Sequence, residues 1–476
     1  MNPKFAKNGR SLTRKLFKVL FLPNYYVNLH HDYLIYKKQS IMKKGIYFIV
    51  LMFVSLNIQA DDYFNHGGIR YKIESFIDQE LRVTNPNESD FSTTNLVIPA
   101  TIKTKQGQVW TVTAIGDGAF TKYSGDFGYK NLRSITIPKT VKLIHKDAFK
   151  DGTIEEITAD CSIEMPIEPL AKTLKKVYLG PSATISTAVG LTQIYYGDHP
   201  HWTNVSLSPA NKTMIMENGV LYDKAKTKIL WFDRNRAGAY IMPSTVKSMP
   251  KGTMKKAKNL TEFTFGKGYS GKIEEFEFDG CDQLKSVCIL GPVKSIGSYA
   301  FGDCKLLKNV KLPETLEELS YGAFRRTGIE QITLPKSLKT VKDLVFDGCD
   351  NLRVIDIPEG IEIIPKSFCS SCKNLTKIIL PRTVKEIKTW AFKQCNSLVS
   401  ITIPKSVTYI GQGAFADCEK LSMVYCYASQ ATLFDYPFFR CPIKEFHCIK
   451  GTKEYYENSQ KKESSIQSYI DDLTTE

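Results

Sequence analysis

The amino-acid sequence predicts a repeat solenoid, an array of about 23-residue units that are mainly β-strand with short turns or helices. Phenylalanine recurs at positions 278, 301, 324, 346, 368, 392, 415 and 438, in steps of 23, 23, 22, 22, 24, 23 and 23. Proline recurs with the same period at positions 313, 335, 358, 381 and 404. A fixed period in this range is typical of stacked units that bury their apolar faces only against their neighbours.

One unit illustrates the expected local structure. Ile401, Thr402 and Ile403 alternate inward, outward and inward, and their β-branched side chains favour a strand. Pro404 has no N–H to donate to a ladder, so the strand is expected to end there. Apolar residues within 407–415 predict a second inward segment, a short strand on the opposite side, followed by a turn that carries the phenylalanine.

Stacked units place equivalent residues one strand spacing apart, about 4.8 Å, so the phenylalanines are expected to form a continuous core spine. A cysteine follows most of these phenylalanines by three residues, and Cys372 follows Phe368 by four. Three interpretations are open for the cysteines: disulfides, a metal pair at Cys369 and Cys372, or small buried residues. Thr327 and Ala257 occupy the same register, which favours the third interpretation.

The N-terminal 60 residues carry most of the positive charge. They hold ten Lys and Arg and one acidic residue, so residues 61–476 account for only +6 of the total charge of +15. The bulk of the chain therefore lacks the basic excess that would predict a nucleic-acid partner.

The segment 42–60 has the order of a secretory signal peptide. Two lysines follow Met42, an apolar run comes next, and the small residue Ala60 precedes two aspartates. The apolar run is too short for a stable membrane span. We therefore predict export by a signal that starts at Met42, with residues 1–41 as an upstream extension. The protein is expected to be secreted, periplasmic or at the cell surface.

The remainder divides into a cap, an array and a second cap. An open sheet edge invites aggregation, so the first unit of an array is expected to be atypical. The predicted segments are an N-terminal β-rich cap at 61–110, the repeat array at 111–448 with a β-hairpin insertion at about 209–240, and a C-terminal cap with a polar tail at 449–476.

The unit C-x-x-L-x-x-I-x-[IL]-P-x-x-V-x-x-I-[GK]-x-x-A-F-x-x-C resembles the BspA-like leucine-rich repeat of bacterial secreted and surface proteins. The resemblance covers most of 110–448 and is strongest from 278 to 448. It implies a curved leucine-rich-repeat array with a parallel sheet on its concave face and a role in adhesion or host-protein binding. It supplies no catalytic residues.

Motifs that would predict catalysis or a cofactor are lacking in the sequence. It has no phosphate-binding glycine-rich loop, nucleophile elbow or H-E-x-x-H motif. His199 and His201 lie two apart, but a metal needs a third ligand, so a surface loop is favoured there. The carboxylate pairs at 274–275 and 317–318 are expected to be solvated. We expect a protein that is no enzyme and needs no metal or cofactor.

The outward residue of each strand is the candidate for partner binding. These residues are mixed in charge, which favours an extracellular protein or glycan over nucleic acid, although plain solvated sheet surface is an equally open interpretation. The candidates are Tyr178, Tyr195, Lys311, Thr333, Asp356, Ile379, Thr402, Tyr425 and His447.

Two functions are compatible with these expectations. A long sheet face suits an extended partner, which predicts a binding module in adhesion or host interaction. The alternative is a structural or assembly protein of the cell envelope, with side-to-side contacts through the caps or the hairpin. We expect a monomer, and light scattering would distinguish the two functions, because assembly requires more than a strict monomer.

Overall fold

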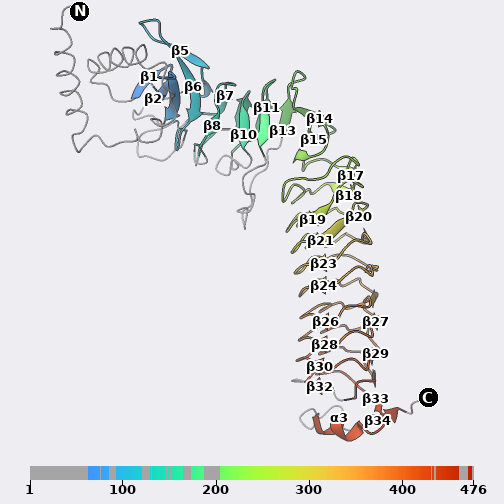
Figure 1. Ribbon diagram of the computed structural model, residues 1–476. Helices are drawn as coiled ribbons and strands as arrows, with labels where there is room; N and C mark the ends of the chain where they lie inside the picture. Colours follow the sequence, from blue (N-terminus) through green and yellow to red (C-terminus); the bar gives the residue numbers. More distant parts are fainter. Residues whose placement is uncertain are drawn as a thin grey trace, which may run out of the picture. The chain divides into compact units, whose positions relative to one another are not determined.

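The structure is a computed structural model that describes residues 63–473 except for 76, 85–92, 121–128, 130, 146–147, 150–151, 165–172, 187–203, 430, 434–435 and 460–469. The predicted signal peptide and residues 1–41 lie outside the described residues. The chain from Phe64 onward forms one compact unit. It is a β-solenoid of about 12 turns, roughly 23 residues apart, with almost no helix (Figure 1). The predicted repeat solenoid is confirmed.

A mixed sheet precedes the array. In spatial order it contains β1 (Tyr63–His66), β2 (Ile69–Ser75), β3 (Glu80–Thr84), β6 (Val109–Ile115) and β5 (Thr101–Lys103), with β8 (Leu143–Ile144) paired to β6. Tyr71, Leu81 and Val112 are fully buried in its core. The Tyr129 hydroxyl donates to the Gly68 carbonyl oxygen at 2.8 Å and ties the following loop to the first hairpin.

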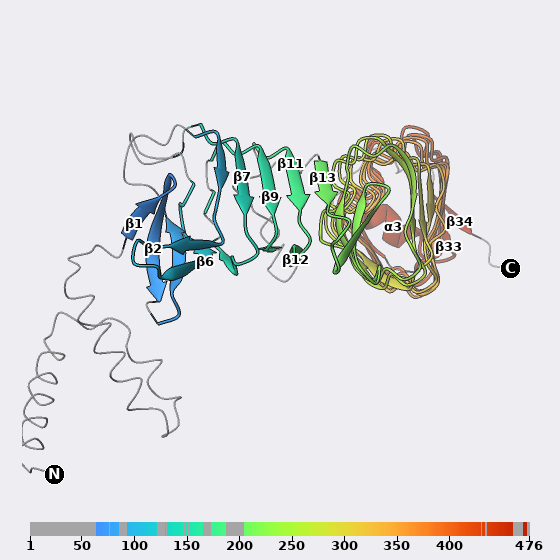
Figure 2. The same cartoon turned by 90° about the horizontal axis from the view of Figure 1, so that it is seen from above.

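The first parallel sheet follows, and Figure 2 shows several of its strands side by side. Its order is β13 (Asn204–Leu207), β11 (Lys176–Leu179), β9 (Glu156–Ala159), β7 (Ser134–Ile137) and β4 (Asn95–Val97). A two-stranded parallel sheet of β10 (Ser162–Glu164) and β12 (Thr184–Ser186) accompanies it. β4 pairs with β7, so the parallel sheet includes a strand from the segment 61–110.

A three-stranded antiparallel sheet divides the core in two. Its strands are β14 (Met214–Glu217), β15 (Val220–Asp223) and β16 (Ile229–Phe232), which lie within the range 209–240. Both faces of β15 and β16 are covered: Val220 and Phe232 belong to the core on the C-terminal side, whereas Leu221 and Trp231 belong to the core on the N-terminal side. This sheet therefore separates two apolar clusters instead of projecting from the array.

The second half contains two rows of parallel strands, which recur with the period of the units. The longer strands are β17 (Gly238–Ile241), β18 (Leu260–Phe265), β20 (Ser286–Ile289), β22 (Asn309–Lys311), β25 (Val354–Asp356), β27 (Lys377–Ile379), β29 (Ser400–Ile403), β31 (Met423–Cys426), β33 (Glu445–Ile449) and β34 (Ile470–Leu473). The shorter strands are β19 (Gly271–Ile273), β21 (Val293–Ile296), β23 (Glu318–Leu319), β24 (Thr340–Val341), β26 (Ile363–Ile364), β28 (Glu386–Ile387), β30 (Tyr409–Ile410) and β32 (Thr432–Leu433). The unit between β22 and β25 has only an isolated bridge, from Gln331 to Val354, in place of a longer strand.

The phenylalanine spine lies in the core of the second half. Phe301 and Phe324 stack with a centroid distance of 5.3 Å and an angle of 2°, and Phe324 and Phe346 stack at 5.6 Å and 5°. Phe415 and Phe438 repeat this geometry near the other end, at 5.3 Å and 10°. The predicted core position of these residues is confirmed, since all of them are fully buried.

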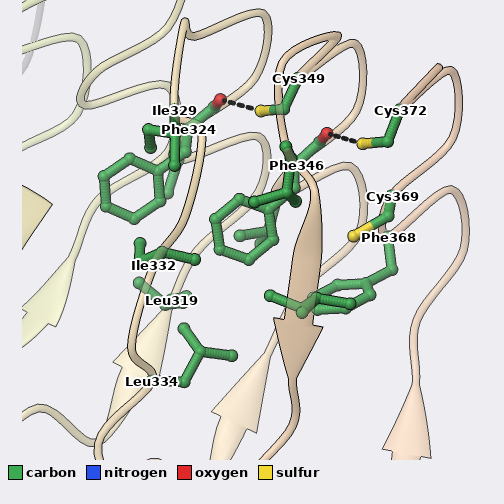
Figure 3. Close-up of a cluster of buried hydrophobic side chains, with 14 of the residues drawn as sticks. Leu319, Phe324, Ile329, Ile332, Leu334, Phe346, Cys349, Phe368, Cys369 and Cys372 are labelled. Carbon is green, nitrogen blue, oxygen red and sulfur yellow. Dashed lines mark hydrogen bonds between the residues drawn. The ribbon is translucent and has the colours of Figure 1, made fainter. Parts of the chain in front are cut away.

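The register assumed at Phe368 is wrong by one residue. Its ring is nearly perpendicular to that of Phe346, at 82°, and Figure 3 shows this break in the stack. The backbone N–H of Cys369 donates to the Ala391 carbonyl oxygen, as the N–H of Phe392 does to Ala414, so Cys369 occupies the phenylalanine position. Phe368 fills the alanine position before it and still places its ring in the core.

The same shift exchanges the inward and outward directions expected for two isoleucines on the preceding short strand. Ile363 was expected to face inward, but 47% of its surface is exposed, whereas Ile364 is buried. The spacing of Phe368 alone misled the assignment because a phenylalanine in the neighbouring position also satisfies the apolar pattern.

The cysteines are buried free thiols. Seven thiols at this register donate to the carbonyl oxygen of the phenylalanine position one unit earlier, at 2.9–3.4 Å, and Figure 3 shows two of these bonds. Burial raises the pKa of Cys281 to about 12 and also raises that of Cys304. No disulfide links the twelve cysteines and only Cys288 is partly exposed, which confirms the small-residue interpretation. Protonated, inaccessible thiols are poor nucleophiles and poor metal ligands.

Two charged side chains, the half-buried Arg234 and the fully buried Glu277, hold the first turn of the second half. Arg234 donates to the carbonyl oxygens of Gly252 and Thr253. Glu277 accepts hydrogen bonds from the backbone N–H groups of Gly252 at 2.7 Å and Met254 at 3.1 Å. In later units the N–H groups at the equivalent positions donate to backbone carbonyl oxygens of the next unit. The Glu277 carboxylate therefore replaces part of the backbone ladder at this junction.

A tyrosine closes the other end of the core. Helix α3 (Lys453–Ser459) places Tyr456 against the last units, where it is fully buried. Its hydroxyl donates to the Ala428 carbonyl oxygen at 2.8 Å and accepts from the Ala431 N–H at 3.2 Å. Tyr456 thus satisfies backbone groups that a further unit would otherwise pair.

Candidate partner-binding face

The outward side chains of the long strands in the second half lie along one side of the array, here called the sheet face. The strands form three paired groups: β17, β18, β20 and β22; β25 and β27; and β29, β31, β33 and β34. Thr333 lies between the first two groups, outside any strand. Strand pairing aligns Asp356 with Ile379, and Thr402 with Tyr425 and His447. The sequence candidates Lys311, Thr333, Asp356, Ile379 and Thr402 are exposed there, and Tyr425 and His447 are half-buried.

The remaining two candidates are not on this row. Tyr178 is exposed, but it lies on β11 of the first parallel sheet, between Thr158 and Ser206. Tyr195 lies outside the described residues. The structure therefore brings seven of the nine predicted residues together.

Three further residues belong to the row but were missed: Ile241, Thr264 and Cys288. Pairing aligns Ile241 with Thr264, Thr264 with Cys288, and Cys288 with Lys311. Ile241 is 74% exposed. The in–out–in alternation of Val287, Cys288 and Ile289 was a usable signal, since only the irregular spacing of these early units obscured it.

A group of basic side chains covers the sheet face from β20 to β27. Lys285, Lys311, Arg353 and Lys377 are exposed, and none has a carboxylate within ion-pair distance in the part of the chain that the structure describes. Lys308, by contrast, pairs with Glu330 at 3.0 Å. We call the four unpaired residues the basic zone.

Aromatic and polarizable side chains follow on β31 and β33. Tyr425 stacks on His447 with a centroid distance of 4.9 Å and an angle of 10°, and the Tyr425 hydroxyl donates to the Met423 sulfur at 3.8 Å. Tyr427 is 44% exposed on the same side of the chain. Tyr and Met are enriched in protein interfaces, so these four residues form an aromatic zone suited to partner contact.

The turns on the third side of each unit carry aromatic rings too, but the faces of these rings are largely covered. Phe276 stacks on Tyr299 at 5.3 Å and 11°. The Trp390 ring lies under the Lys366 ammonium at 5.0 Å, and a Cβ added at Gly413, where φ is +54°, would lie 3.0 Å from that ring. These contacts reduce the ring surface that the turns offer to a partner.

The described residues give little support for a metal site or a membrane-spanning helix. No group of three His, Cys, Asp or Glu there could hold a metal ion, and no described helix is long and apolar enough to cross a membrane. Hydrogen bonding to Lys339 lowers the pKa of Glu317, as expected for a carboxylate in an ion pair. The predicted histidine loop at 199–201 lies outside the described residues.

Fold and surface together define a β-solenoid repeat protein with an exposed parallel sheet face. The family model described as the BspA type leucine rich repeat region matches residues 113–165, 232–353 and 343–467, in six copies. The chain belongs to this family.

One solved structure supports the same fold. The chain is similar to a leucine-rich repeat protein from Bacteroides ovatus, with 20% identity and a TM-score of 0.54 over 86% of this chain and 100% of that chain. It is also similar to a leucine-rich repeat protein from Eubacterium ventriosum, with 21% identity and a TM-score of 0.40 over 74% and 93%. The pneumococcal vaccine antigen PcpA has 16% identity and a TM-score of 0.40 over 87% and 99%. No curated protein matches the chain.

Proposed function

We propose that this protein is an exported, non-catalytic binding protein that engages an extracellular protein or glycan through its sheet face, in adhesion or host interaction. The observation that carries the proposal is the contrast between the periodic core and this face. The core positions repeat Phe and Cys, whereas the outward row varies from Lys311 to Ile379 to Tyr425. A scaffold that fixes the position of these side chains but not their identity is suited to recognition.

Membership of a bacterial repeat family supports an extracellular role. The order of charges, apolar run and Ala60 in the segment 42–60 supports export. N-terminal sequencing of the exported protein is expected to begin after Ala60. A mature chain that retained residues 2–40 would contradict both the signal peptide and the upstream extension.

Replacing Lys311, Ile379 and Tyr425 together by serine is expected to abolish partner binding without unfolding the protein, because all three side chains point outward. Binding would be measured by surface plasmon resonance against a panel of purified host matrix proteins and mucosal glycans. Circular dichroism would confirm that the fold is retained.

A matched control exists on the short-strand face, the outward side of β19–β32. Lys385, Ile363 and Tyr409 have the same three side-chain types and lie on or next to β26, β28 and β30. Serine at these positions is expected to leave binding unchanged. If the control lost binding and the sheet-face variant retained it, the sheet face would not be the binding surface.

A further inference from the structure

The basic zone extends across five successive units. Lys285 precedes β20, Lys311 ends β22, Arg353 precedes β25 and Lys377 begins β27. Backbone bonds run from the Lys308 N–H to the Lys285 carbonyl and from the Thr376 N–H to the Arg353 carbonyl, so these units are direct neighbours in the stack. The cations therefore lie in two pairs of neighbouring units, Lys285 with Lys311 and Arg353 with Lys377, with units about 4.8 Å apart within each pair. The unit between the pairs contributes Glu330 and Thr333 to this face instead.

Negative charge on this part of the face is smaller. Lys308 pairs with Glu330, and its hydrogen bond to the carboxylate lowers the pKa of Glu330, with a smaller contribution from the charge of Arg353. Asp356 is the other acidic side chain among the outward residues of these strands. The zone thus keeps a local excess of positive charge. At the aromatic zone, the nearest charged group is the Glu445 carboxylate, which lies 3.1 Å from His447 Nε2.

In the first parallel sheet, by contrast, cationic side chains form ion pairs. Arg133 and Lys175 both pair with Glu155, at 2.6 Å and 2.8 Å, and Lys176 pairs with Glu156 at 2.6 Å. On the short-strand face Lys294 and Lys339 both pair with Glu317. Unpaired cations on adjacent strands of the basic zone are therefore not a general consequence of the repeat.

We propose that the basic zone binds a linear anionic polysaccharide, one that carries sulfate or carboxylate groups on its repeating sugars. This inference rests on the proposed binding function and names the partner's chemistry. Two pairs of cations on one face of the array complement an extended polymer that carries repeated negative charges. An extended acidic peptide normally gains backbone hydrogen bonds from a free sheet edge. Here β20 is paired on both sides, and the outer side of β25 is occupied by the preceding unit, through the bridge between Gln331 and Val354 and the bond from the Arg353 N–H to the Glu330 carbonyl.

A folded protein partner fits the basic zone less well. Protein interfaces depend on buried aromatic or arginine anchors surrounded by tightly packed contacts. The larger apolar side chains exposed within the zone are Val354 and Ile379, at 39% and 38%. The zone has charge along its length without an aromatic anchor, which is the combination expected for a charged polymer.

The test is binding of full-length protein to heparin, used as the sulfated probe, by isothermal titration calorimetry over a range of salt concentrations. The variant combines Lys285→Gln, Lys311→Gln, Arg353→Gln and Lys377→Gln. Each exposed ion pair contributes a few-fold in affinity, so the loss of four is expected to weaken binding at least about tenfold. The dependence of affinity on salt is expected to become shallower, because fewer counterions are displaced.

A control variant removes the same charge from the short-strand face, through glutamine at Lys272, Lys294, Lys339 and Lys385. It is expected to bind heparin nearly as tightly as the wild type. Equal weakening of both variants would show that only net charge matters and would overturn the proposal. So would a wild-type protein that fails to bind heparin at low salt.

Poly-glutamate serves as a second probe with the same kind of charge on a polypeptide. Heparin is expected to bind the wild type more tightly than poly-glutamate does. Tighter binding of poly-glutamate than of heparin, lost in the basic-zone variant, would assign the zone to an acidic polypeptide instead. The wild type could fail to bind heparin while the serine variant at Lys311, Ile379 and Tyr425 still loses binding to a protein or glycan of the panel. In that case the polysaccharide inference would be wrong and the proposed function would stand.

Discussion

Replacing Phe324 by alanine is expected to lower the free energy of unfolding by about 3–5 kcal/mol, the cost of a large cavity in a packed core. The ring is fully buried and stacks on Phe301 and Phe346 at 5.3 Å and 5.6 Å. Because each unit contacts only its neighbours, the cavity cannot be filled by distant side chains. Urea denaturation followed by circular dichroism would measure the loss.

Phe439→Ala provides the comparison, since this ring lies one residue after the spine and is 46% exposed. Its loss is expected to cost less than about 1 kcal/mol. Similar effects from Phe324→Ala and Phe439→Ala would show that the spine does not carry the stability of the array.

Stability is also expected to fall as pH rises from about 4.5 to about 7, because of Glu277. Burial is the largest cause that raises the pKa of Glu277 to about 7, and Glu274 adds to it, while the Gly252 and Met254 N–H groups and Arg234 act against it. The unfolded chain releases this proton near the ordinary glutamate pKa of 4.5, so between these values only the folded protein is protonated. The contribution is full below pH 4.5 and is lost by pH 7, on the order of 3 kcal/mol.

Glu277→Gln removes this titration, so the variant should gain stability relative to wild type as pH rises through the same window. The amide also loses one acceptor for the Gly252–Met254 turn, which shifts the whole curve without changing its slope. Thermal unfolding at several pH values would give both curves. Glu314→Gln, at an exposed carboxylate, controls for the loss of one charge. Parallel curves for Glu277→Gln and wild type would contradict the prediction.

Part of the candidate face could be predicted from alternation alone. Thr402 lies between two apolar strand residues, so its outward direction follows from the geometry of a strand. The same rule placed Tyr425 and His447, whose stacking at 4.9 Å could not be predicted, because it depends on the pairing of β31 with β33. The absence of an ion pair at Lys311 could not be predicted either, because it depends on the positions of all nearby carboxylates.

The assignment at Phe368 shows the limit of spacing as evidence. Apolar residues occupy both Phe368 and Cys369, and either could have filled the core position. Backbone hydrogen bonds to the next unit settle the register in favour of Cys369. The regular cysteine series, in which Cys372 falls 23 residues after Cys349, was the signal that could have revealed the shift.

Three features could be predicted from the sequence: the period, the burial of residues such as Phe415 and Cys418, and the outward direction of the sheet face. They could be predicted because stacking imposes one pattern of burial on every unit. The antiparallel sheet that divides the core and the burial of Glu277 became apparent only from the tertiary structure. Trp231 and Phe232 are adjacent apolar residues in the sequence, yet they face different cores. A buried carboxylate such as Glu277 is tolerated only where particular N–H groups meet it, and those groups come from another unit of the chain.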